Sequence, residues 1–233
     1  VDVPNTHPRN HSGTAFSAVI SQTVPRPRPG SDEISRAVED AWVGRRSQVA
    51  FLGRVTTADG REIDEVFVAD VPEDLTQPGD GPLEGTSTRY PAPPHGTIQR
   101  RLTRTETHRF PGVSGTRHWL RSSPDGSRIG FLKPDDAGIV QFWTVSPDGG
   151  PPVQVTSNRH SVASAFTWHP DGRRVAFVCD DRICLADAVT GETVPLSEQC
   201  HPRPEACVIS PDGRRIAYVR RGNENEIWVA DVR

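Results

Sequence analysis

Short apolar runs recur at a regular distance along the second half of the chain, and each run follows the same polar turn. The runs cover residues 129–132, 175–178 and 216–219, and the turns before them read Ser-Pro-Asp-Gly or His-Pro-Asp-Gly. The prolines of these turns, at positions 124, 170 and 211, are 46 and 41 residues apart. Strand-forming repeats of about 40–50 residues are typical of β-propellers, in which each repeat forms one blade. The pattern therefore predicts an all-β fold.

Each repeat also contains other landmarks in a fixed order. A third strand ends in Ala-Asp, at Asp70, Asp187 and Asp231, and a fourth strand ends in a pair such as Leu-Thr. We interpret the aspartates of the Pro-Asp-Gly turns, and His169 at the start of one turn, as turn formers rather than catalytic groups. The order predicts a β-propeller fragment of about four four-stranded blades. They span about 13–104, 115–157, 162–197 and 205–233.

The first predicted blade is enlarged by insertions at 24–47 and 72–96, and its innermost strand is expected near 14–22. The first insertion carries the one predicted helix, with Ser31 as the N-cap and Gly44 as the stop. Five apolar residues follow the spacing i, i+3, i+4, i+7 and i+8, which places them on one face of a helix: Ile34, Ala37, Val38, Ala41 and Trp42. The second insertion is rich in Pro, Gly, Asp and Thr, which predicts a long surface loop.

The composition excludes some classes of function. The 20 Gly and 22 Pro suit many strands joined by turns. The net charge of −3 gives no reason to expect nucleic-acid binding. No apolar stretch approaches the ~20 residues of a membrane-spanning helix. The chain has no Met and opens at Val1, so we expect a fragment of a longer protein.

Four cysteines leave the redox state open. Cys179 and Cys184 flank a predicted hairpin, and a two-residue turn at Asp181-Arg182 would set them directly opposite each other. Cys200 and Cys207 fall in the next loop. One alternative is four small, partly buried thiols. The other is a disulfide pair in an exported protein.

The chain resembles the C-terminal half of an uncharacterised bacterial β-propeller family. The resemblance extends over nearly all of the chain and rests on the segments 7–9, 29–34, 42–44, 91–94, 99–103, 117–119 and 138–141. Members look seven-bladed, which implies about three further blades in the parent protein. The repeats are more distantly similar to those of TolB, a periplasmic protein, and of oligogalacturonide lyase, an enzyme that binds a divalent metal through histidines. Localisation in the bacterial cytoplasm or the periplasm stays open.

Propeller ligands usually bind at the rim of the central channel, where several histidines of this chain are expected. The candidate catalytic residues are His7, His108, Arg117 and His118, and the candidate metal ligands are His108, His118, His160 and His201. Both His160 and His201 lie ten residues before a repeat proline, which predicts equivalent positions on neighbouring blades. Imidazole suits a divalent transition metal, and Arg117 would bind an anionic group. In the alternative interpretation, these histidines are ordinary exposed loop residues.

Two functions are consistent with these sequence features. The first is a TolB-like recognition scaffold that binds a protein or peptide at the channel rim. The second is a metal-dependent enzyme, similar to oligogalacturonide lyase, that acts on acidic carbohydrate. The sequence contains no Gly-x-Ser-x-Gly elbow and no phosphate-binding loop motif. This lack of a recognisable catalytic constellation favours the first function, and whether the protein is an enzyme stays open.

Overall fold

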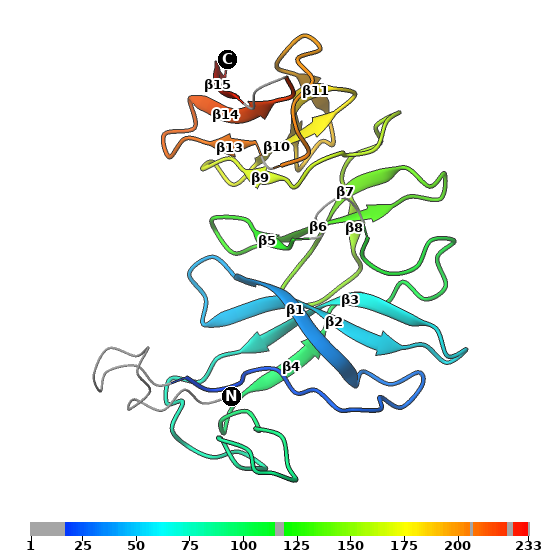
Figure 1. The fold of residues 1–233 in the computed structure, drawn as a ribbon, viewed down its shortest axis with the longest axis vertical. Helices are drawn as coiled ribbons and strands as arrows, with labels where there is room; N and C mark the ends of the chain where they lie inside the picture. Colours follow the sequence, from blue (N-terminus) through cyan, green and yellow to red (C-terminus); the bar gives the residue numbers. More distant parts are fainter. Residues whose placement is uncertain (1–16, 115–118, 206, 223–225, 233) are drawn as a thin grey trace.

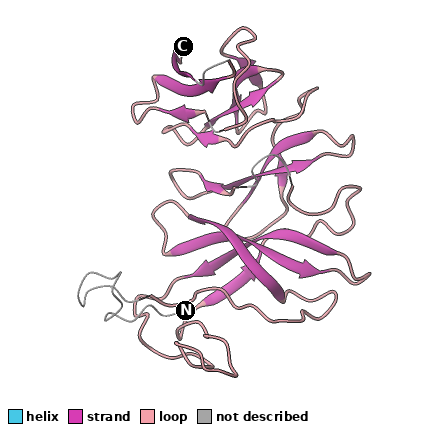
Figure 2. Ribbon diagram, viewed as in Figure 1, coloured by secondary structure: helices cyan, strands magenta, loops and turns pink. Residues whose placement is uncertain are grey.

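The computed structural model describes residues 17–114, 119–205, 207–222 and 226–232. Within these ranges every regular secondary-structure element is a β-strand (Figure 1, Figure 2). The strands form four antiparallel sheets that follow one another along the chain, three with four strands and the last with three. A search of the same ranges finds no helix with the length and apolar character needed to cross a membrane.

Each sheet is a meander, because strands that are hydrogen-bonded to each other are also consecutive in sequence. The first sheet contains β1 (Ile34–Trp42), β2 (Gln48–Thr56), β3 (Glu62–Asp70) and β4 (Ile98–Arg101). The second contains β5 (Arg121–Ser122), β6 (Ile129–Pro134), β7 (Val140–Val145) and β8 (Val153–Gln154). The third contains β9 (Thr167–Trp168), β10 (Arg174–Cys179), β11 (Arg182–Asp187) and β12 (Thr193–Pro195). The fourth contains β13 (Val208–Ile209), β14 (Arg215–Arg220) and β15 (Glu226–Asp231).

The four sheets pack face to face, and the first strand of each sheet contacts the first strand of the next. β1 contacts β5, β5 contacts β9 and β9 contacts β13. A separate apolar core fills each interface. Phe131 lies in the first core, Phe142 and Phe177 in the second, and Ile183 and Ile216 in the third. Hydrophobic burial between successive sheets therefore holds the stack together.

The Pro-Asp-Gly turns connect the first and second strands of the last three sheets, as the sequence predicts. Gly126, Gly172 and Gly213 have φ angles of 71°, 69° and 74°, a conformation that glycine adopts without steric cost. The aspartate of each turn accepts a bond from a backbone N–H two residues later, as Asp125 does from Ser127 at 3.0 Å. These aspartates therefore stabilise the turns.

The first of these turns predicts an acid-sensitive contribution to stability. Hydrogen bonds from the Ser123 hydroxyl and from Ser127 lower the pKa of Asp125 to about 2. A carboxyl group with a lowered pKa stabilises the fold above its unfolded pKa of about 4 and loses that effect as pH falls through its folded pKa. We expect Asp125→Asn to reduce the fall of the urea midpoint between about pH 4 and pH 2. An unchanged pH dependence would contradict this role.

The helix predicted over residues 31–42 is wrong, because residues 34–42 form β1, the first strand of the first sheet. Residues 17–22 of the expected innermost strand form no strand. The segment assigned to the first insertion therefore supplies a strand of the sheet itself.

Two β-bulges explain why β1 has the apolar spacing of a helix. Its pairing with β2 shifts register between Ile34 and Ala37 and again between Val38 and Ala41. Each bulge adds one residue to a pattern that otherwise has a period of two. Ile34 and Ala37 pack into the core on one face of the sheet, while Val38 and Ala41 pack against the core on the other. The five apolar residues therefore have the spacing of one helical face, but in the strand they do not lie on one face of the sheet.

The segment between β3 and β4 is a surface loop with hydrogen bonds of its own. The backbone N–H of His95 donates to the Gln77 carbonyl at 2.9 Å, and that of Ala92 donates to the Pro82 carbonyl at 2.8 Å. This agrees with the loop predicted for residues 72–96.

Candidate functional site

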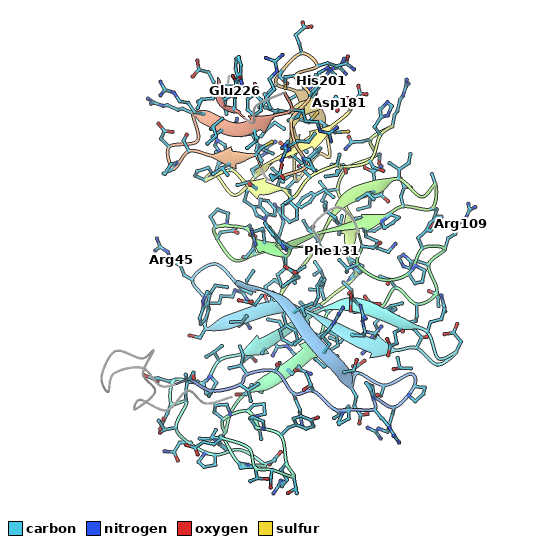
Figure 3. All side chains as sticks on the ribbon, in the orientation of Figure 1. Arg45, Arg109, Phe131, Asp181, His201 and Glu226 are labelled. Atoms are coloured by element: carbon cyan, nitrogen blue, oxygen red, sulfur yellow. The ribbon has the colours of Figure 1, made fainter. Side chains whose placement is uncertain are left out.

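The stack of sheets has two ends, and different connections between strands lie at each end. The turn end carries the connections from the first to the second strand of each sheet, at 43–47, 123–128, 169–173 and 210–214. The loop end carries the hairpins between second and third strands and the connections between sheets, at 102–120, 155–166 and 196–207. In Figure 3, Arg45 marks the turn end, while Arg109, Asp181 and His201 mark the loop end. The described histidine candidates all lie on the loop end.

The hairpin between β10 and β11 presents two consecutive aspartates at the loop end. Cys179 pairs with Arg182, so the turn consists of Asp180 and Asp181 and the predicted turn at Asp181-Arg182 is wrong. The two aspartates have φ angles of 53° and 55°, as a type I′ hairpin turn requires. Asp180 also accepts a hydrogen bond from Arg182 Nη1 at 2.5 Å.

This turn changes the expected arrangement of the cysteines. Because Cys179 pairs with Arg182 and Cys184 pairs with Phe177, the two thiols are diagonal neighbours on one face rather than directly opposite. All four cysteines are free thiols in this structure. Burial raises the pKa of Cys207 to about 12. That thiol is therefore protonated and unreactive at neutral pH.

His160 and His201 both contact the aspartate turn. Nε2 of His160 lies 3.8 Å from a carboxylate oxygen of Asp180, and Nδ1 of His201 lies 3.3 Å from a carboxylate oxygen of Asp181. One histidine comes from the connection before the third sheet and the other from the connection after it. Their side chains are 63% and 58% exposed, so water screens both contacts strongly.

The remaining candidates do not join this pair. His108 is half-buried in the connection between the first and second sheets, where its backbone N–H donates to the Thr105 carbonyl at 2.9 Å. His7, Arg117 and His118 lie outside the described residues. In the part of the chain that the structure describes, no group of three or more His, Cys, Asp or Glu side chains is placed to hold a metal ion. The metal site and the catalytic roles stay predictions.

Three arginines stack on aromatic rings, Arg109 and Arg220 at the loop end and Arg121 on β5, two residues before the turn at 123–128. The Cζ atom of Arg109 lies 5.5 Å from the ring centroid of Phe110, that of Arg121 lies 5.2 Å from Trp119, and that of Arg220 lies 5.1 Å from Trp228. Arg109, Arg121 and Arg220 are exposed. Stacking holds each guanidinium in place while its edge stays accessible. These three pairs form what we call the arginine–aromatic rim.

The first pair of the rim is fixed by the neighbouring sheet. Nη1 of Arg109 donates to the Asp136 carbonyl at 3.1 Å. The ring of Phe110 lies against Gly138, where an added Cβ would come within 3.3 Å of the ring. Both contacts are with the hairpin between β6 and β7. The connection from the first sheet is therefore attached to the second sheet at this point.

A buried ionic network fixes the start of the same connection. Glu65 on β3 is fully buried and accepts hydrogen bonds from Nη2 of Arg101 at 3.1 Å and from the backbone and hydroxyl of Thr105 at 2.7 and 2.9 Å. The Thr103 hydroxyl donates to the other carboxylate oxygen of Glu65. The side chain of Arg101 is itself 3% exposed and also pairs with Glu106 at 2.8 Å. Glu65 thus binds the segment that leads to Arg109.

At the turn end, His169 links the third sheet to the fourth. Its ring is buried, and Nε2 lies 3.0 Å from the Gly213 carbonyl in the next Pro-Asp-Gly turn. Nδ1 lies 3.0 Å from a carboxylate oxygen of Asp171 within its own turn. His169 therefore has the structural role predicted for it, with the added contact between sheets.

Sequence reasoning missed most of the arginine–aromatic rim and all of the Glu65 network. Arg109 is adjacent to Phe110 in sequence, and Arg121 lies two residues after Trp119. Such short spacings of arginine and an aromatic residue are common, so they do not identify a stacked pair. The Arg220–Trp228 pair depends on the pairing of β14 with β15. Glu65 is visible only as an acidic residue next to the apolar run 66–69.

Comparison with known proteins supports the fold. No family model matches the chain. The chain is similar to the uncharacterized protein YidR of Escherichia coli (strain K12), with 44% identity over 238 residues that cover 100% of this chain and 56% of that protein. The chain thus spans about half the length of this curated relative.

Two solved structures have a similar fold. TolB from Acinetobacter baumannii matches with a TM-score of 0.51 and 20% identity, over 79% of this chain and 38% of that chain. A puromycin hydrolase matches with a TM-score of 0.52 and 16% identity, over 86% of this chain and 28% of that chain. The described sheets are therefore blades of a TolB-like β-propeller fragment.

Proposed function

We propose that this TolB-like propeller is a recognition scaffold that binds a protein or peptide through its loop end. The arginine–aromatic rim is the observation that carries the proposal. Arg and Trp are enriched among the residues that contribute most to binding at protein interfaces, and Lys and Glu are depleted there. A stacked guanidinium presents several donors in a fixed geometry, which suits backbone carbonyls and carboxylates of a bound chain.

The surroundings of the rim support a protein or peptide as the ligand. Trp228 is 41% exposed and Phe110 is 37% exposed, so each of these two pairs offers an exposed apolar ring as well as the cation of its arginine. The indole N–H of Trp228 donates to Glu226 at 3.1 Å, which fixes the orientation of the ring. Ordered side chains lose little conformational entropy on binding. No contact of the described residues favours the enzyme that acts on acidic carbohydrate, so that alternative is not proposed.

Substitution of the rim is expected to weaken binding by about thirtyfold or more at each pair, since hot-spot truncations cost about 2 kcal/mol or more. Peptides are first selected from a displayed library on the immobilised chain. The dissociation constant of a selected peptide is then measured by calorimetry for the native chain, Arg109→Ala, Arg220→Ala and Trp228→Ala.

Arg45→Ala is the matched control, because Arg45 is an exposed arginine at the opposite end of the stack. The control is expected to bind as tightly as the native chain. The proposal fails if no peptide is enriched, or if Arg45→Ala weakens binding while the rim variants do not. Release of unsaturated products from oligogalacturonide would instead establish the lyase alternative.

A further inference from the structure

The hairpin between β10 and β11 carries two cysteines close to its turn. Cys179 is the last residue of β10, and Cys184 lies in β11 on the same face of the sheet. Both belong to the apolar core between the second and third sheets. The Cys184 sulfur lies 3.7 Å from the backbone carbonyl oxygen of Cys179. The strand register therefore places the two thiols side by side at the loop end.

A hydrogen bond joins the two sulfur atoms. The Cys184 thiol donates to Cys179, which lowers the pKa of Cys179, and the same interaction raises the pKa of Cys184. The thiolate, and not the thiol, is the nucleophilic form of cysteine. The pair thus contains one sulfur that is activated for attack, Cys179, and one neighbouring thiol that can react with it afterwards.

The two thiols are covered but not sealed from solvent. Cys179 and Cys184 are each 6% exposed, whereas Cys207 is 0% exposed. Burial also raises the pKa of Cys207 to about 12, so that thiol carries little thiolate. The residual exposure of the pair suits an oxidant as small as a hydroperoxide.

The Cys179 thiol also attaches the hairpin to the connection before the third sheet. Its sulfur donates to the His160 carbonyl at 3.3 Å, and Cys179 forms an isolated antiparallel bridge with Val162. The imidazole of His160 in turn lies 3.8 Å from Asp180 of the hairpin turn. A sulfur atom in a disulfide has no hydrogen to donate, so oxidation of Cys179 would remove the contact with the His160 carbonyl.

We propose that Cys179 and Cys184 form a reversible disulfide when the chain reacts with a hydroperoxide, such as hydrogen peroxide. The disulfide would join β10 to β11 and release the connection that carries His160. The loop end then has two states, set by the redox state of one hairpin. This proposal does not depend on the function of the rim.

The reaction balances in two steps. The Cys179 thiolate attacks one peroxide oxygen; an S–O bond forms, the O–O bond breaks, and the departing hydroxide takes up a proton to become water. The Cys184 sulfur then attacks the Cys179 sulfur. The S–S bond forms, the S–O bond breaks, and the second hydroxide leaves with the proton of Cys184 as water. Two thiols are oxidised by two electrons, and the peroxide is reduced to two waters.

Peptide mapping of the native chain tests the proposal without any substitution. The chain is treated with a slight excess of hydrogen peroxide, free thiols are blocked with a maleimide, and the protein is digested without reductant. Cleavage after Arg and Glu places Cys179 in peptide 175–182 and Cys184 in peptide 183–192, apart from Cys200 and Cys207. We expect these two peptides to appear linked, with two hydrogens fewer than the separate peptides, and to separate again after dithiothreitol.

Three variants assign the roles of the two sulfurs. Cys184→Ser is expected to stop at a sulfenic acid on Cys179, which dimedone traps. Cys179→Ser is expected to slow the oxidation of residue 184 by about tenfold or more, because the activated thiolate is lost. Cys200→Ser is the matched control and is expected to form the 175–182 to 183–192 link as the native chain does. Sulfenic acid that accumulates on Cys179 of the native chain without that link, or a link from Cys179 to Cys200 instead, would overturn the proposal.

The imidazole signals of two histidines report the second state. We expect the NMR signal of His160 to shift on formation of the disulfide and to return on reduction. The signal of His169, which is buried at the turn end, is expected to stay in place. An unchanged His160 signal in the fully linked chain would show that the disulfide does not release the His160 connection and would overturn that part of the proposal.

Discussion

Replacing Glu65 with alanine is expected to lower the free energy of unfolding by about 3 kcal/mol or more. Glu65 is fully buried and forms an ion pair with the buried Arg101 guanidinium, so the substitution leaves that charge without this partner. Removing one member of a buried ion pair typically costs about 3–5 kcal/mol. It also leaves Thr103 and Thr105 without the carboxylate that accepts their hydrogen bonds. Urea denaturation followed by tryptophan fluorescence measures the loss.

Two further variants make the result interpretable. Arg104→Met breaks the ion pair with Asp32, in which both side chains are about half exposed, and is expected to cost less than about 1 kcal/mol. Glu65→Gln keeps the shape of the side chain and is expected to lie between Arg104→Met and Glu65→Ala. If Glu65→Ala were no more destabilising than Arg104→Met, the network would not be what fixes the connection at 102–113.

The second large effect is expected at Phe131, whose ring lies at the centre of the interface between the first and second sheets (Figure 3). Phe131 is fully buried and pairs across the strands with Trp143. Truncation of a buried Phe to Ala costs about 3–5 kcal/mol, because apolar contacts are lost and a cavity remains. We expect Phe131→Ala to destabilise the chain by that amount.

The matched control for this experiment is Tyr90→Ala, since Tyr90 is an aromatic residue that is 71% exposed in the loop between β3 and β4. Its substitution is expected to change the free energy of unfolding by no more than about 0.5 kcal/mol. A Phe131→Ala effect as small as that of the control would mean that the first two sheets do not form one cooperative core.

The sequence is most informative where a single local device repeats. The Pro-Asp-Gly turns predict the hairpins that lead into the strands near Ile129, Val175 and Ile216, because the turn conformation depends on only a few neighbouring residues. The fold class follows from the same repeat. One of the third-strand aspartates is explained by the structure, since Asp187 binds both Arg173 and the backbone of the following turn.

Prediction fails where the outcome depends on pairing between strands. The spacing of Ile34 and Ala37 matches a helix unless the bulges opposite β2 are known. The sequence places the turn between Cys179 and Cys184 one residue too far along, because two adjacent aspartates in the left-handed conformation are an uncommon choice. For the candidate site, the sequence locates His160 and His201 on neighbouring connections but does not show that both reach one turn.

The two bulges of β1 have a consequence for the way this chain changes during evolution. Loss of one residue between Ile34 and Ala37, or between Val38 and Ala41, would return that part of β1 to the regular alternation and keep the flanking side chains on their present faces. The same loss within β6, which pairs with β7 without any shift, would turn every following side chain to the opposite face. We therefore expect single-residue deletions to be tolerated in β1 but not in β6.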